Sequence, residues 1–128
     1  MRNNLTIHLS RTCFERTVLE IADLLPSGIK ESLDNVQILV TAWPSHEQLS
    51  TAGLDERHDL LGLYEGIPRT ERGNYNLSLP DVIWLFQRPL ESLCEDYWQL
   101  RAEIRMTILH EIGHHLGWDD QQLEELEA

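Results

Sequence analysis

The segment from His110 to Asp120 constrains this chain more than any other. It reads His110-Glu111-Ile112-Gly113-His114-His115-Leu116-Gly117-Trp118-Asp119-Asp120. On an α-helix each residue advances by about 100°, so His110 and His114 lie about 40° apart and one turn from each other. Both imidazoles can therefore point at one ion. Such a site requires a helix that the rest of the fold holds rigidly.

The same segment supplies two further groups that suit a metal site. Glu111 lies beside the imidazoles, rotated by about 100°, where its carboxylate can take a proton from metal-bound water without being a ligand. Gly117 can adopt a positive φ and turn the chain back, so that Asp120 can reach the metal. Catalytic zinc sites have three protein ligands and an open position. The pattern H-E-x-x-H-x-x-G-x-x-D thus predicts Zn2+ bound by His110, His114 and Asp120, with Glu111 as the general base.

Simpler roles remain open for several of these residues. The H-E-x-x-H pattern also arises by chance on surface helices, and Asp120 could be a solvated or capping carboxylate. Asp119, with a Gln three residues later, is typical of the start of a short final helix. His115 is rotated by about 140° from His110, towards the expected buried face, which favours packing or hydrogen bonding over metal binding. Trp118 is expected to cover the core.

Composition and charge limit the partners. With 128 residues, the chain is expected to form a single domain over residues 1–128. Its net charge of −12 argues against nucleic acid, which requires clustered Lys and Arg. Cys13 and Cys94 form no C-x-x-C pair and are interpreted as reduced, half-buried thiols. Neither a leader peptide nor a run of 18 apolar residues is present, so we expect a cytoplasmic protein without membrane contact.

Hydrophobic patterning predicts an α+β fold. A helix is expected over residues 10–25, capped by Ser10 or Thr12, with one more turn at 29–33. Strands are expected at 36–42, 60–65 and 82–86, with 36–42 central and best buried, whereas residues 5–9 could be a strand or a frayed terminus. Residues 44–57 are expected to be a loop containing one helical turn at most. A long helix should run from residue 90 or 91 to Leu116, with Ile108, Leu109, Ile112 and Leu116 buried opposite the two metal histidines.

The chain resembles the zincin-like metallopeptidases of short bacterial proteins, also described as minimal metalloproteases. The resemblance covers residues 14–126 and includes Leu33-Asp34-Asn35-Val36, Leu61-Gly62-Leu63-Tyr64-Glu65-Gly66-Ile67-Pro68, Leu79-Pro80-Asp81, Gln87-Arg88-Pro89-Leu90, Ile104-Arg105 and His110-Glu111-Ile112-Gly113-His114-His115. It implies a small mixed β-sheet packed on the long active-site helix, with an N-terminal helix and a short C-terminal helix. It also implies His110, His114 and Asp120 as zinc ligands and Glu111 as general base.

The resemblance leads us to expect a zinc metallopeptidase acting on a peptide or protein. The substrate would lie along a sheet edge, for which residues 60–65 are the candidate. Tyr64 or Arg88 could stabilise the oxyanion, although a structural role is the simpler explanation for each. Larger metzincins usually have His where this chain has Asp120, and they carry a Met-containing turn that is missing here.

Two other functions remain open. One is a zinc-binding protein of the same fold with little or no catalysis. The other is a metal-dependent endoribonuclease of the rRNA-maturation type, whose histidine spacing is similar to that of His110, His114 and Asp120. That family has no Glu next to its first His, and the acidic charge also argues against it.

Overall fold

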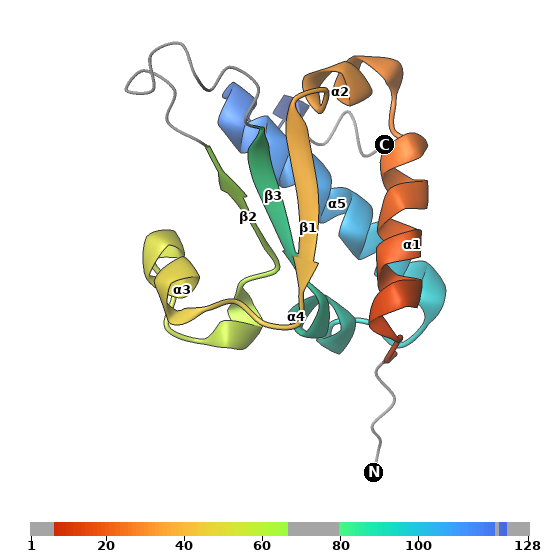
Figure 1. Ribbon diagram of the computed structural model, residues 1–128, viewed down its shortest axis with the longest axis vertical. Helices are drawn as coiled ribbons and strands as arrows, with labels where there is room; N and C mark the ends of the chain where they lie inside the picture. Colours follow the sequence, from red (N-terminus) through yellow and green to blue (C-terminus); the bar gives the residue numbers. More distant parts are fainter. Residues whose placement is uncertain (1–6, 67–79, 120, 123–128) are drawn as a thin grey trace.

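The computed structural model describes residues 7–66, 80–119 and 121–122. It is built from six helices and three strands in these parts of the chain (Figure 1). In chain order they are Arg11–Asp23 (α1), Ser27–Ser32 (α2), Val36–Thr41 (β1), His46–Ala52 (α3), the 3-10 helix Arg57–Asp59 (η1), Gly62–Glu65 (β2), Asp81–Phe86 (β3), Gln87–Ser92 (α4) and Tyr97–Leu116 (α5). The predicted α+β fold is confirmed.

The three strands form one mixed sheet in the order β1-β3-β2. β1 pairs parallel to β3 and β2 pairs antiparallel to it, so that Ile83 of β3 is opposite both Ile38 and Tyr64. The expectation that residues 36–42 form the central, best-buried strand was wrong, because β1 lies at one side of this sheet. β3 is central, and five of its six residues are buried. Its sequence is apolar on both faces, whereas β1 exposes Gln37.

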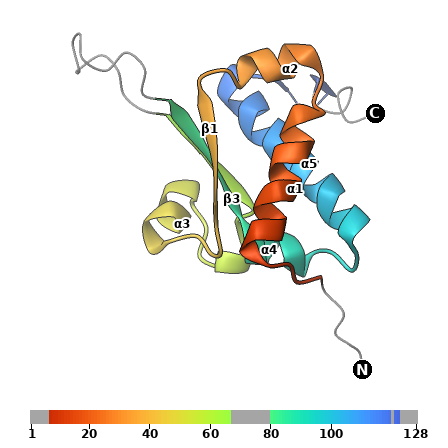
Figure 2. The same cartoon turned by 45° about the vertical axis from the view of Figure 1, so that its right-hand side comes forward.

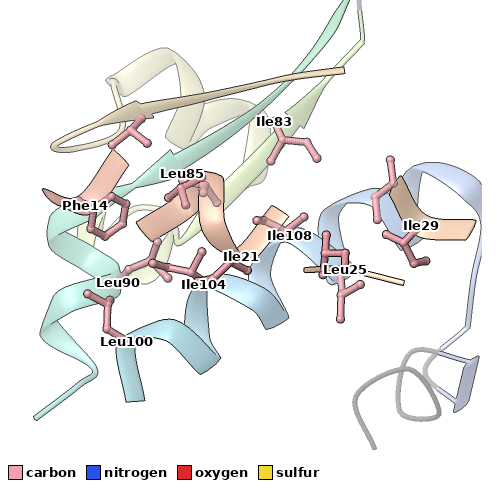
Figure 3. Close-up of a cluster of buried hydrophobic side chains, with 14 of the residues drawn as sticks. Phe14, Ile21, Leu25, Ile29, Ile83, Leu85, Leu90, Leu100, Ile104 and Ile108 are labelled. Carbon is pink, nitrogen blue, oxygen red and sulfur yellow. The ribbon is translucent and has the colours of Figure 1, made fainter. Parts of the chain in front are cut away.

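The two faces of the sheet pack against different helices. Ile83 and Leu85 point into a large core that is shared with α1 and α5, and Figure 3 shows both side chains in one cluster with Phe14, Ile104 and Ile108. On the opposite face, Phe86 belongs to a smaller cluster with Leu49 of α3 and Leu60. Figure 2 shows α1 and α5 together on one side of the sheet and α3 on the other. α5 is thus anchored along one side of the strands.

The N-terminal helix begins where the sequence predicts. The Ser10 side chain accepts a hydrogen bond from the Cys13 N–H at 3.1 Å, and α1 then runs to Asp23. α2 takes the place of the extra turn expected at 29–33. α3 lies in the segment that was expected to be a loop, and a reciprocal pair of hydrogen bonds between Ser45 and Gln48 caps it. This capping box is a local helix signal that the Pro and Ser residues nearby obscured.

The long helix starts later than predicted. Instead of one helix from residue 90 or 91, α4 ends at Ser92 and α5 begins at Tyr97. Asp96 causes the restart, because its side chain accepts a hydrogen bond from the Gln99 N–H at 2.8 Å and so caps a new helix. Ile108, Leu109 and Ile112 are buried as expected. Leu116 is 46% exposed, so its predicted burial was wrong.

Residues 7–9 are not a strand. Leu9 lies against α4, where its N–H donates to a Glu91 carboxylate oxygen at 2.9 Å and its carbonyl accepts from Gln87 at 3.0 Å. The Ile7 N–H donates to the carbonyl of Cys94. Residues 5 and 6, the other part of the segment considered as a strand, lie outside the described residues.

The two cysteines are both free thiols. Cys13 is half-buried as expected, but Cys94 is only 1% exposed and belongs to the core. Across the parts of the chain described above, no helix combines the length and the apolar character needed to cross a membrane.

Candidate metal centre

The last two turns of α5 bring the two predicted metal histidines together. The imidazole rings of His110 and His114 are nearly parallel, at an interplanar angle of 10°, and their centroids are 6.0 Å apart. His110 is half-buried and His114 is exposed. Two rings side by side at one helix face, open to solvent at one end, can direct nitrogen atoms at a single ion, as their spacing predicts.

Gly117 ends α5 in the way that the sequence predicts. It has a φ of 81°, in the left-handed region that favours glycine. The Trp118 N–H then donates back to the Gly113 carbonyl at 2.8 Å, and the Gly117 N–H to that of His114 at 3.2 Å. This closing turn satisfies two carbonyls of the last helical turn and reverses the chain. Trp118 packs against the large core, in agreement with its expected covering role.

The predicted third ligand, Asp120, lies outside the described residues. Its neighbour Asp119 forms two hydrogen bonds with Gln122. The Asp119 N–H donates to the Gln122 side chain at 2.9 Å, and the Gln122 N–H donates to the Asp119 carboxylate at 2.8 Å. This pair confirms the capping role predicted for Asp119. Most of the short C-terminal helix expected after it also falls outside the described residues. Within them, no cluster of three His, Cys, Asp or Glu side chains could hold a metal ion.

Glu111 lies in a half-buried position between α5 and β2. Its Oε1 accepts a hydrogen bond from the backbone N–H of Tyr64 at 2.9 Å. Burial raises the pKa of the carboxyl above its usual range, while the hydrogen bond from Tyr64 and the nearby His114 and His110 act in the opposite direction. A carboxyl with a raised pKa holds a proton more readily than an ordinary glutamate, which suits a group that accepts one and gives it back.

Tyr64, which contacts Glu111, also contacts Asp81, and the sequence did not predict that these two residues act together. The Tyr64 hydroxyl donates to Oδ2 of Asp81 at 2.7 Å, and the Tyr64 ring stacks on the imidazole of His115 with centroids 4.0 Å apart. Nε2 of His115 is 3.9 Å from the same Asp81 oxygen. The expectation that His115 faces the buried side was wrong, since its side chain is 44% exposed, but it does pack beside the site.

The two oxyanion candidates have different surroundings. The Tyr64 hydroxyl points to Asp81, as described. Arg88 belongs to α4, where its guanidinium donates to buried Glu91 at 2.5 Å. Figure 1 shows α4 at the end of the molecule opposite the C-terminal end of α5 that carries the histidines. Arg88 therefore has a structural contact far from the metal centre.

Comparison with known proteins decides the family. A family model described as zincin-like metallopeptidase matches residues 33–128, which include the whole of β1, β2, β3 and α5. The chain belongs to the zincin-like metallopeptidases. Among solved structures, it is similar to a conserved hypothetical protein from Thermus thermophilus, with 25% sequence identity and a TM-score of 0.56. That match covers 84% of this chain and 94% of the other. No curated protein matches.

The donor groups of this zincin-like metallopeptidase fit a divalent metal ion. Imidazole nitrogens are common ligands of zinc. In catalytic zinc sites with two histidine ligands, the third protein ligand is typically a carboxylate or another histidine. His110 and His114 supply the two nitrogens from one helix face. The turn after Gly117 directs the chain back after the second of them. Nothing in this arrangement conflicts with a metal at the end of α5.

Proposed function

We propose that this chain is a zinc-dependent peptidase in which His110, His114 and Asp120 hold the ion and Glu111 is the general base. The observation that carries the proposal is the position of Glu111, one residue from His110 and fixed to an outer strand by the Tyr64 N–H. When bound, zinc supplies Lewis-acid chemistry, acidifying a water molecule and polarising the carbonyl of the peptide bond.

Glu111 moves the proton in this reaction. Its Oε1 is engaged by the Tyr64 N–H, which leaves Oε2 as the oxygen that takes a proton from the attacking water and returns it to the leaving amine. Partial burial supports this role, because it holds the pKa of the carboxyl above its usual range. The half-buried location between α5 and β2 also limits the positions that the carboxylate can take.

β2 is the strand along which a peptide would lie. It is at one side of the described sheet, as expected for residues 60–65. The Leu61 carbonyl accepts a hydrogen bond from the Phe86 N–H of β3. In an antiparallel pair, alternate residues turn their backbone N–H and C=O groups towards the partner strand. Residues 61, 63 and 65 therefore face β3, and residues 62 and 64 turn their backbone groups away from it. The Tyr64 N–H is already bonded to Glu111, so an extended peptide could pair with the other backbone groups of that outer side, such as those of Gly62.

The experiment compares purified wild type with Glu111→Gln after loading with zinc. Metal content is measured by mass spectrometry, and hydrolysis is followed with a diverse peptide library. We expect both proteins to carry zinc, and only the wild type to cleave peptides. Equal cleavage by the variant would remove Glu111 from the mechanism. A zinc-loaded wild type that cleaves no peptide in the library would overturn the peptidase assignment and leave a zinc-binding protein of the same fold.

A further inference from the structure

Tyr64 contacts three side chains at once: those of Glu111 and His115 on α5 and that of Asp81 on β3. We infer that Tyr64 is a positioning residue, whose backbone N–H orients the Glu111 carboxylate and whose side chain, held between Asp81 and His115, keeps that N–H in place. The inference rests on the proposed function of Glu111 as the base. It concerns how the base is held in position.

β2 and α5 are in register along this contact. Gly62 faces Thr107, Tyr64 donates to Glu111, and the Tyr64 ring covers His115. The three helix residues are four positions apart, about 6.0 Å along the helix axis for each step, and residues 62 and 64 are separated by about 6.8 Å along a strand. The strand therefore follows one stripe of the helix. Its backbone reaches the helix at the level of the proposed base.

The Tyr64 N–H is directed away from β3. The backbone groups of residues 61, 63 and 65 face β3, so the Tyr64 N–H makes no hydrogen bond to that strand. The side chain provides the missing restraint. Its hydroxyl is bonded to Asp81, which is 6% exposed and belongs to β3, and its ring is stacked at 12° on His115.

The restraint matters because Glu111 is a long side chain. A glutamate has three rotatable side-chain bonds, and only a defined position of its carboxylate allows efficient proton transfer. A charge-assisted hydrogen bond from a backbone N–H fixes one oxygen. If β2 shifts outward, this bond lengthens and the carboxylate gains freedom, while His110 and His114 on α5 stay where they are.

The test uses Tyr64→Phe, which keeps the ring and the backbone N–H and removes only the hydroxyl. Trp84→Phe is the matched control. It removes the hydrogen bond from the Trp84 Nε1–H to Glu65, which is 3.0 Å long and also joins β3 to β2. The acceptor is the residue next to Tyr64, so this bond does not hold the Tyr64 side chain. The first readout is the NMR signal of the residue 64 amide in metal-free protein. Glu111→Gln provides the reference for a weakened acceptor.

With Tyr64→Phe, we expect the residue 64 amide proton to move upfield and to exchange with solvent about tenfold faster, while amides of β3 and α5 are unchanged. With Trp84→Phe, we expect the residue 64 amide to keep its wild-type shift and exchange rate. In the zinc-loaded enzyme, Tyr64→Phe should lower kcat by about ten- to a hundredfold, with KM and zinc affinity within twofold of wild type.

A second variant guards against failure of the first to fold. His115→Ala removes the stacked ring from an exposed position and should produce a smaller shift of the same amide. The inference is overturned if both variants leave the residue 64 amide at its wild-type shift and exchange rate, or if Trp84→Phe changes it as much as Tyr64→Phe does. These NMR results do not depend on turnover. An inactive wild type would therefore contradict the proposed function and still leave the amide measurement to decide the inference.

Discussion

Gly62 of β2 lies so close to Thr107 of α5 that a Cβ placed on the glycine would be 2.6 Å from the Thr107 Cγ2. The same Cβ would be 3.0 Å from the backbone oxygen of Trp84. Helix and strand can approach to this distance only because residue 62 has no side chain. Thr107 is one turn before Glu111, so this approach also sets the distance between β2 and the proposed base.

Gly62→Ala should push β2 away from α5. The added methyl group meets a branched side chain and a backbone atom, and relief of the clash should cost about 1–3 kcal/mol of unfolding free energy. Urea denaturation measures this. Gly28→Ala is the control, because a Cβ at Gly28 meets nothing within 4 Å and the residue lies in α2, where alanine is favoured. Equal stability of the two variants would contradict the close packing at Gly62.

Single substitutions should distinguish the proposed metal ligands from the neighbouring His115. Loss of a residue that only hydrogen-bonds to a metal ligand weakens metal binding by roughly 10–100-fold. We expect His110→Ala and His114→Ala each to weaken zinc binding by more than this. Asp120→Ala should do the same. His115→Ala should keep zinc affinity within about tenfold of wild type, because its ring packs on Tyr64. Calorimetric titration with zinc measures all four. A His115 variant as weak as the His110 variant would contradict the ligand assignment.

The parts of the site that the sequence predicts are those governed by local geometry. The spacing of His110 and His114 determines that they share a helix face, and Gly117 was expected to turn the chain because glycine tolerates positive φ. The pairing of Asp119 with Gln122 is likewise a short-range pattern. In each case the atoms that interact are within five residues of one another, so no knowledge of the tertiary fold is needed.

Contacts between distant segments were not predictable in this way. The hydrogen bond from Tyr64 to Glu111 joins residues 47 positions apart, and it depends on the order of strands in the sheet. Hydrophobicity identified the strands, but it favoured residues 36–42 for the centre because it does not show which strand has partners on both sides. The restart of α5 at Asp96 was missed because apolar spacing alone did not register a capping side chain.

Gly117→Ala should destabilise the end of α5. A non-glycine residue at a φ of 81° is strained, so the variant should lose about 1 kcal/mol or more of unfolding free energy. Gly117→Asn is the matched control, because asparagine tolerates the left-handed region better. Both are compared with wild type by thermal denaturation. The prediction fails if alanine and asparagine have the same effect.

The buried carboxyl group of Glu91 should contribute strongly to stability. It is 3% exposed and accepts hydrogen bonds from the Leu9 N–H, from Gln87 and from Arg88. Glu91→Ala leaves these donors without their acceptor and should cost about 3 kcal/mol. Glu91→Gln keeps an oxygen acceptor and should cost less. Chemical denaturation measures both, and equal losses would show that the hydrogen bonds themselves contribute little.

Cys94 should make the protein less stable at alkaline pH. Burial raises the pKa of its thiol from 9.0 to about 11, with smaller contributions from Glu103, Asp96 and Glu91. Because the folded-state pKa is the higher one, the stability is fully present below about pH 9 and is lost as the pH rises towards 11: the unfolded thiol releases its proton first and favours unfolding. Between about pH 8 and pH 10 the loss should be about 1 kcal/mol. Urea denaturation of wild type and Cys94→Ala at both pH values isolates the effect, since every other titrating group is common to the two proteins. If both lose the same stability over this interval, the thiol is not held protonated by its burial.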